Sequence, residues 1–244
     1  MKLIKKEDYH ELSKEAARII TNQIKTKPNS VICFPTGSTV LGLYKELIKN
    51  YKTHKVDFSK ILVFNLDEYL GLSKKNKQSY NYFLNKNLFN HINIKKQNIN
   101  LLDGSTKNIK KLCLDYEKKL KKHPIDIIIL GIGVNGHIGF NEPGSKFTSK
   151  TRIVNLSKDT IKDNSRFFKN KKVPKKAITI GIATILSSKK IVLLASGKNK
   201  AEAIKKLIKG LITEKVPATA LRKHKDVLVI IDKQAGCLLN KKIV

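Results

Sequence analysis

Residues 126–144 read DIIILGIGVNGHIGFNEPG and join an apolar run to a glycine-rich segment. The run 126–130 is short and rich in isoleucine, which is typical of a strand buried in a parallel sheet. The glycines that follow let the backbone approach a ligand closely, while the strand before them supplies rigidity. His137 lies between two of these glycines, and Glu142 follows in the same segment. This stretch predicts a buried strand with polar groups at its carboxyl end.

Strands and helices alternate outward from this stretch in both directions. Short apolar runs predict strands, and apolar residues at helical spacing predict helices. Besides 126–130, the expected strands are 30–34, 61–64, 177–182, 190–196 and 226–232. The expected helices are 8–25, 41–48, a segment starting at Ser79, 112–120 and 204–211. This alternation predicts an α/β fold, a doubly wound, mostly parallel sheet with helices on both faces (Rossmann-like), in a single domain over residues 1–244.

Two glycine turns follow expected strands and precede expected helices. Gly37 lies in FPTGST among the hydroxyl groups of Thr36, Ser38 and Thr39. Backbone N–H groups at a helix start, together with such hydroxyls, can hold a phosphate group. The spacing matches neither glycine motif that is typical of nucleotide binding, and an ordinary capped turn is the alternative interpretation.

The second glycine turn is ASGKNKAEA, in which Lys198 and Lys200 follow Gly197. A lysine at a helix start opposes the helix dipole unless an anion lies there. The alternative is that these are two more lysines in a lysine-rich chain.

Asp67 and Glu68 lie in the segment NLDEYLG, at the end of strand 61–64. Adjacent side chains in extended backbone point in opposite directions. One carboxylate can therefore face a site while the other makes a structural contact, although a solvated turn is the alternative.

The histidine turn has the composition of an acid–base site. Glu142 can hydrogen-bond the His137 ring directly or through Asn135, which fixes the tautomer and tunes the basicity of the imidazole. A glycine-rich turn with incidental polar residues is the alternative. Arg152 and Arg166 are two of only four arginines, and an arginine kept in such a chain suggests bidentate phosphate binding.

The formal net charge of +31 comes almost entirely from lysine, which supplies 46 of the 50 basic residues. These lysines are scattered over nearly every segment, whereas nucleic-acid readers usually combine arginine forks, aromatic platforms or one basic stripe. We therefore expect solvated faces and no specific nucleic-acid partner. Weak, salt-sensitive polyanion binding is the alternative.

Three cysteines stand far apart and outside any metal-ligand spacing, so we expect reduced thiols and neither a disulfide framework nor a zinc site. The amino terminus lacks the apolar core of a signal peptide, and no apolar run is long enough for a membrane span. A soluble, cytoplasmic protein without a membrane partner is expected.

Segments along nearly the whole chain resemble the glucosamine-6-phosphate deaminase family. They are FPTGST, FNLDEYLGL, SYNYFL, NINLLDG, GIGVNGHIGFNEPGS, TRIVNLS, DNSRFF, VPKKAITIGIATIL and SGKNKAEAI. The resemblance implies an enzyme of amino-sugar catabolism that converts D-glucosamine 6-phosphate and water to D-fructose 6-phosphate and ammonia. It implies a small sugar phosphate as the partner, and neither a metal nor an organic cofactor.

The resemblance also implies roles for particular residues. Asp67 corresponds to the base that moves a proton from C2 to C1, His137 to the group that opens the sugar ring, and Glu142 to the carboxylate that orients it. Asn135 stands where some members have aspartate, so it can hydrogen-bond the ring but cannot stabilise its charge. The residues that match the phosphate site are Thr36, Gly37, Ser38, Thr39, Arg166 and Lys200.

One departure concerns regulation. Allosteric members carry a lysine two residues after the arginine that matches Arg152, but Val154 fills that place here. We therefore expect an unregulated enzyme and favour a monomer over a homo-oligomer. The alternatives are a lactonase or sugar-phosphate isomerase on the same sheet, a polyanion-binding protein, and a degenerate enzyme without turnover.

Overall fold

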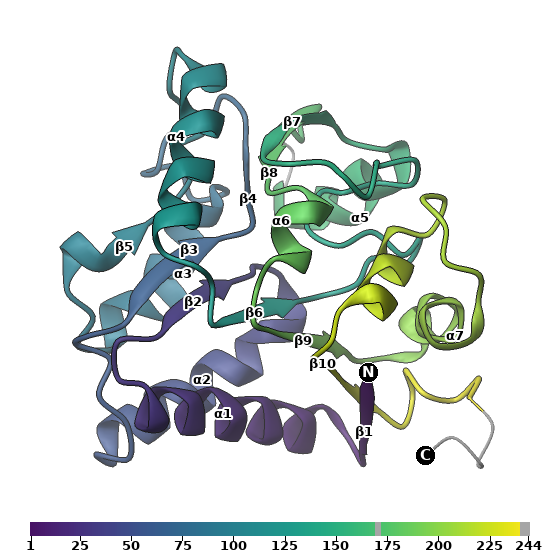
Figure 1. The fold of residues 1–244 in the computed structure, drawn as a ribbon, viewed down its shortest axis with the longest axis horizontal. Coiled ribbons are helices and arrows are strands. Elements are labelled where there is room, and N and C mark those ends of the chain that lie inside the picture. The colour runs from purple at the N-terminus through teal and green to yellow at the C-terminus, as the bar shows by residue number, and fades with distance from the viewer. Residues whose placement is uncertain (169–171, 240–244) are drawn as a thin grey trace.

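A seven-stranded parallel sheet forms the centre of the protein in the computed structural model, which describes residues 1–168 and 172–239 (Figure 1). Its strand order is β1-β10-β9-β6-β2-β3-β5, and every pairing in it is parallel. The strands are β1 (Lys2–Lys6), β2 (Val31–Phe34), β3 (Leu62–Asn65), β5 (Ile99–Asn100), β6 (Ile127–Leu130), β9 (Lys190–Ala195) and β10 (Val227–Asp232). The run 126–130 is thus a central strand, because β6 pairs with both β2 and β9.

Helices cover both faces of this sheet. They are α1 (Tyr9–Thr26), α2 (Leu41–Lys52), α3 (Tyr80–Asn87), α4 (Ile109–Lys122), α5 (Lys158–Phe168), α6 (Ile182–Leu186) and α7 (Ala201–Lys209). In Figure 1, α1 and α2 lie on one side of the sheet and α4 and α6 on the other. Two large clusters of the core accordingly join α1 and α2 to one face of the sheet and α4, α6 and α7 to the other, and a smaller third cluster lies around Tyr69 and Phe140. The predicted doubly wound fold is confirmed.

Side-chain caps explain where several helices begin. Asp8 accepts a hydrogen bond from the backbone N–H of Glu11 at the start of α1, and Ser79 accepts one from Tyr82 at the start of α3. Such caps satisfy N–H groups that have no partner within the helix. The cap at Ser79 matters for the site, because it fixes the first turn of α3.

A second, three-stranded antiparallel sheet corrects one expectation. It consists of β4 (Asp67–Tyr69), β8 (Lys176–Thr179) and β7 (Arg152–Asn155), in the order β4-β8-β7. The segment 177–182 was expected in the parallel sheet, but its strand part lies in this small sheet. The pattern of apolar residues in a sequence indicates that a segment is a buried strand, but it does not indicate which other strand that segment pairs with.

Candidate active site

A cavity of about 340 Å³ opens at the carboxyl ends of β2, β3, β6 and β9. Asp67 and His137 both line it, as the strand-end argument predicts. The other lining residues are Pro35, Thr36, Gly37, Ser38, Thr39, Val40, Leu66, Tyr80, Gly131, Ile132, Gly133, Gly139, Phe140, Thr160, Asp163, Asn164, Ser196, Asn199 and Lys200. The cavity therefore brings together residues from most of the length of the chain.

Strand β8 ties the segment that bears Asp67 to the turn that bears His137. Asp67 pairs with Thr179 in the antiparallel register, and the Thr179 hydroxyl accepts a hydrogen bond from the backbone N–H of Phe140 at 3.1 Å. The Asn141 amide also donates to the carbonyl of Ile180 at 2.9 Å. The relative position of the carboxylate and the imidazole is thus set by one shared strand.

Asn65 fixes the turn between β3 and β4, just before Asp67. Its side-chain amide donates to the carbonyl of Asp67 at 2.8 Å and accepts from the N–H of Leu102 at 2.9 Å. The Tyr116 hydroxyl donates to the Asn65 carbonyl at 2.9 Å. These buried polar groups satisfy one another, which makes the turn rigid.

The Asp67 carboxylate points into the cavity with only 6% of the residue exposed. Burial raises its pKa well above the usual value of 3.8, and the charge of Glu68 raises it further. A carboxylate with a raised pKa is a stronger base, so it accepts a carbon-bound proton more readily than an ordinary carboxylate.

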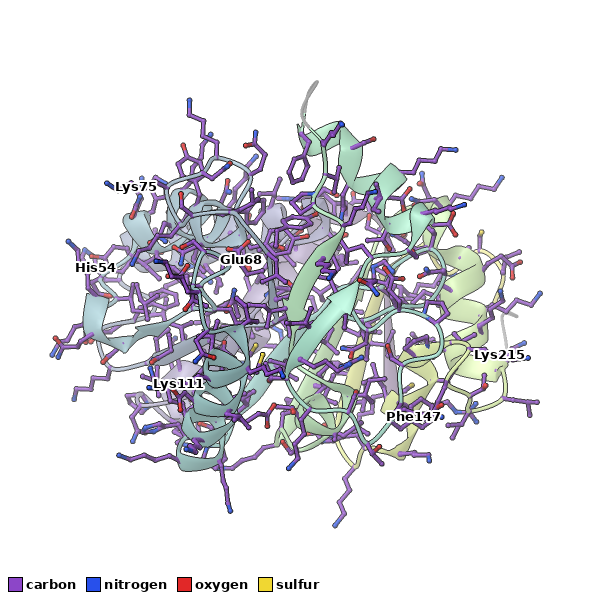
Figure 2. The ribbon with its side chains drawn as sticks, turned by 90° about the horizontal axis from the view of Figure 1, so that it is seen from above. His54, Glu68, Lys75, Lys111, Phe147 and Lys215 are labelled. Atoms are coloured by element: carbon purple, nitrogen blue, oxygen red, sulfur yellow. The ribbon has the colours of Figure 1, made fainter. Side chains whose placement is uncertain are left out.

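Glu68 points the opposite way and makes a structural contact, as the alternation of side chains in extended backbone predicts. Its carboxylate accepts hydrogen bonds from the backbone N–H groups of Tyr69, Tyr80 and Asn81 at 2.9, 3.0 and 2.9 Å. Burial raises its pKa to about 7, although these three N–H donors oppose the shift. Figure 2 shows Glu68 among packed side chains inside the molecule. Glu68 thereby anchors the first turn of α3, and with it Tyr80, at the cavity.

His137 is held from behind by Asn135 and Glu142. Its Nδ1 lies 2.8 Å from the side-chain oxygen of Asn135, and the Asn135 amide nitrogen donates to Glu142 at 3.1 Å. The reverse orientation of the amide would place its oxygen against the carboxylate, so Nδ1 carries the hydrogen and donates it to Asn135. Nε2 of His137 is then the basic ring nitrogen.

Burial favours a neutral imidazole at His137, although nearby charges act in both directions. Burial lowers its pKa below the usual 6.5, the Glu142 carboxylate opposes this shift, and the charge of Lys200 reinforces it. Glu142 Oε2 lies 3.6 Å from Nδ1. A neutral ring of fixed tautomer can accept a proton at Nε2 and return it.

The two glycine turns have the same local structure. Gly37 and Gly197 adopt φ values of +105° and +92°, which an L side chain rarely takes. Each begins a short 3₁₀ turn, Ser38–Val40 and Lys198–Lys200, which runs directly into α2 or α7. Two helix starts with their backbone N–H groups therefore meet at one cavity, which is a favourable place for an anion.

Most of the expected site residues meet at this cavity. Thr36, Gly37, Ser38, Thr39, Asp67, His137 and Lys200 line it, whereas Asn135 and Glu142 lie behind the imidazole. Arg166 lies on α5, and its side chain is outside the described residues. Arg152 lies elsewhere, where it donates to Asn141 and Ser145 and lines a separate hollow with Val154.

Four polar lining residues that come from helices were given no role by the sequence analysis. Tyr80 comes from α3, and Thr160, Asp163 and Asn164 come from α5. A helix can reach the mouth of the site only through tertiary packing, so spacing within the sequence does not reveal these residues. The available signal was the family resemblance, because its segments SYNYFL and DNSRFF contain Tyr80, Asp163 and Asn164.

Exposed lysines and clusters of possible metal ligands were the other features considered in the sequence. Lys75, Lys111 and Lys215 are exposed, and Figure 2 shows them at the upper left, the lower left and the right of the molecule. Within residues 1–168 and 172–239, no group of three or more His, Cys, Asp or Glu side chains is placed to hold a metal ion. Over the same residues, no helix combines the length and apolar character that a membrane span requires.

Comparison with known proteins gives concordant matches. The family model of glucosamine-6-phosphate isomerases and 6-phosphogluconolactonases matches residues 5–230. Glucosamine-6-phosphate deaminases of Clostridium novyi (strain NT) and Thermoanaerobacter sp. (strain X514) are 56% and 55% identical over 241 residues, covering 98% of this chain and 100% and 95% of theirs.

Solved structures agree with these relatives. A monomeric glucosamine-6-phosphate deaminase superposes with a TM-score of 0.96 at 46% identity, covering 98% of this chain and 100% of that one. A 6-phosphogluconolactonase from Thermotoga maritima reaches a TM-score of 0.75 at 23% identity, over 95% and 98% of the two chains. At that identity the second match supports the fold alone.

Proposed function

The chain belongs to the family of glucosamine-6-phosphate isomerases and 6-phosphogluconolactonases, and we propose that it is the deaminase of that pair. The reaction converts D-glucosamine 6-phosphate and water to D-fructose 6-phosphate and ammonia. The observation that carries this proposal is the convergence of Asp67 and His137 on one cavity, which also receives both glycine turns.

His137 opens the pyranose ring before the carbon chemistry begins. Ring opening moves the proton of the C1 hydroxyl to the ring oxygen and breaks the bond between C1 and that oxygen. Nε2 of His137 can take the first proton and deliver it, because Asn135 holds the hydrogen on Nδ1. Glu142 supplies the negative charge that Asn135 lacks, since it lies close enough to stabilise a transient imidazolium.

Asp67 carries out the isomerisation. Its carboxylate removes the proton from C2 of the open-chain sugar, and the same carboxyl group returns a proton to C1. In the same step the amino nitrogen loses one proton and the C1 oxygen gains one, so the product is an imine at C2 beside a C1 hydroxyl group. Water then adds to the imine and ammonia leaves, which gives the ketone of fructose 6-phosphate. One carboxyl group can serve both carbons because C1 and C2 are adjacent and the carboxyl group lies over one face of the planar intermediate.

The phosphate group lies at the two glycine turns. Thr36, Ser38 and Thr39 offer hydroxyl groups, the starts of α2 and α7 offer backbone N–H groups, and Lys200 offers a positive charge. A dianion is held best when several donors reach it from separate loops. Arg166, on α5, is proposed as a further phosphate ligand.

The substrate decides between the two branches of the family. We expect the purified protein to release ammonia from D-glucosamine 6-phosphate and to leave 6-phosphogluconolactone at its spontaneous rate of hydrolysis. Enzyme-dependent hydrolysis of the lactone, without ammonia release from the amino sugar, would assign the chain to the lactonase branch. A protein that converts neither substrate would be a degenerate member.

The assembly and compartment follow from the same proposal. The chain acts as a monomer, and the solved monomeric deaminase to which it is 46% identical supports this. It works in the cytoplasm, where sugar phosphates are retained by their charge and thiols stay reduced. The three cysteines are free in the structure, two buried and Cys237 exposed, as that compartment requires.

A further inference from the structure

A buried carboxylate that does not line the cavity supports the second glycine turn from behind. Asp232 ends β10 with only 4% of the residue exposed. Its carboxylate accepts a hydrogen bond from the Ser196 hydroxyl and two from the backbone N–H of Gly197, at 3.0 and 3.2 Å. It also accepts one from the N–H of Ala235 at 2.7 Å.

These bonds determine the path of the chain between β9 and α7. Gly197 has a φ of +92°, and the turn that it begins runs through Lys198–Lys200 into α7. Ser196, Asn199 and Lys200 of this turn all line the cavity. Both oxygens of Asp232 hold the Gly197 peptide, so the orientation of that peptide is tied to the end of the neighbouring strand.

The first turn is held in a different way. The residue that begins each 3₁₀ turn is a glycine, so it has no side chain that could cap the turn. At the first turn the Tyr9 hydroxyl donates to the carbonyl of Ser38 at 3.1 Å and accepts from the N–H of Gly42 at 2.7 Å. At the second turn the Asp232 carboxylate, which does not line the cavity, accepts the hydrogen bond of the Gly197 N–H. Donors already satisfy the Asp232 charge, which limits its repulsion of an anion in the cavity.

We propose that Asp232 is a positioning residue that sets the affinity for the substrate's phosphate group by holding the 196–200 turn in shape. This inference rests on the proposed function in one respect only, that the substrate carries a phosphate. Asp232 does not touch the reacting atoms. Its loss therefore weakens binding and leaves the chemical step, which belongs to Asp67 and His137, nearly unchanged.

The test is Asp232→Asn, with Asp126→Asn as the matched control. Asp126 is also a buried carboxylate that accepts a hydrogen bond from a backbone N–H, that of Val31 at 2.9 Å. It directly precedes β6, so it lies at the amino end of that strand, whereas the cavity lies at the carboxyl ends. Asp126 additionally receives bonds from Lys27 and Lys189, so its substitution lowers stability without reaching the cavity.

We expect Asp232→Asn to raise KM for D-glucosamine 6-phosphate at least about tenfold while kcat changes by less than about threefold. The dissociation constant of inorganic phosphate, measured by calorimetry, should rise in parallel. The control should lower Tm and leave both quantities near their wild-type values. If Asp232→Asn does not fold, Asp232→Ser, which keeps one acceptor without the buried charge, is measured in the same way.

Two outcomes would overturn the proposal. One is a folded Asp232 variant with unchanged KM and unchanged phosphate affinity. The other is a variant whose kcat falls by as large a factor as its KM rises, together with the lowered Tm of the control, which would make Asp232 merely structural. Failure of the proposed function is a separate result, because phosphate binding can be compared between the variants even if the wild type releases no ammonia.

Discussion

Asp67 and Glu68 show how two identical functional groups acquire different tasks from their surroundings. Glu68 is saturated by three backbone N–H donors, whereas the Asp67 carboxylate faces the cavity. Each is buried, and each has its pKa raised by that burial. The charge of Glu68 raises the pKa of Asp67 further, so the structural residue also tunes the proposed base.

This coupling predicts the direction of a pH shift. A base works when it is ionised, so the acid limb of kcat/KM against pH follows the pKa of Asp67 in the free enzyme. Glu68→Gln removes a negative charge that raises this pKa, and the acid limb should therefore move to lower pH. A pH profile of ammonia release measures the shift, with Glu11→Gln as a control at an exposed pair with Lys14. An acid limb that stays in place, in a folded Glu68→Gln variant, would contradict the coupling.

At the scale of elements, the turn after β6 holds the imidazole by close backbone approach. A Cβ at Gly133 would lie 2.2 Å from Cε1 of His137, whereas a Cβ at Gly131 would meet nothing within 4 Å. Only glycine fits at position 133, because the His137 ring occupies the space that a side chain would need.

Gly133→Ala should displace the imidazole and lower kcat by about 100-fold, since small misplacements of catalytic groups have such effects. The measurement pairs ammonia release with the ring nitrogen NMR signals of His137, which report its tautomer and surroundings. Gly131→Ala, which lines the same cavity, should leave those NMR signals unchanged. Unaltered His137 signals in Gly133→Ala would show that the ring does not depend on this contact.

The elements that were predictable from sequence are the ones whose environment is uniform. Strands β2, β6 and β9 are buried almost throughout, so their composition alone marks them. β1 was not predicted, because KLIKK places lysines on an edge strand. β4 and β7 were missed because their pairing with β8 depends on tertiary contacts rather than on a local pattern.

The same distinction explains which residues of the site were predictable from the sequence. Asp67 and His137 follow buried strands, so the strand-end rule placed them at one edge without knowledge of the structure. Asn65, Tyr80 and Asp232 act through partners far away in the sequence, and no local spacing indicates them. The tautomer of His137 likewise depends on the orientation of the Asn135 amide, which only the three-dimensional arrangement determines.

At the scale of the whole molecule, the unusual quantity is the net charge of +31. Lysines occur in nearly every segment of the chain, and the three labelled in Figure 2 lie well apart, so we expect a broad positive field rather than a single stripe. Such a field attracts a dianionic sugar phosphate at low ionic strength and offers no particular geometry to a nucleic acid.

The assembly provides a prediction at this scale. We expect a monomer near 27.6 kDa by light scattering, with hyperbolic kinetics. The expectation for the kinetics rests on the family resemblance, by which Val154 stands where regulated members carry a lysine. An anionic effector would then lack one positive partner beside Arg152, which lines the same hollow as Val154. A hexamer with sigmoidal kinetics that N-acetylglucosamine 6-phosphate relieves would contradict this prediction.

The central claim is that Asp67 and His137 act on one bound sugar, and the most direct test is ammonia release by Asp67→Asn. Loss of the base should lower kcat with D-glucosamine 6-phosphate by about 100- to 10,000-fold, while the sugar phosphate still binds with near wild-type affinity. An Asp67→Asn variant that releases ammonia at close to the wild-type rate would contradict the account.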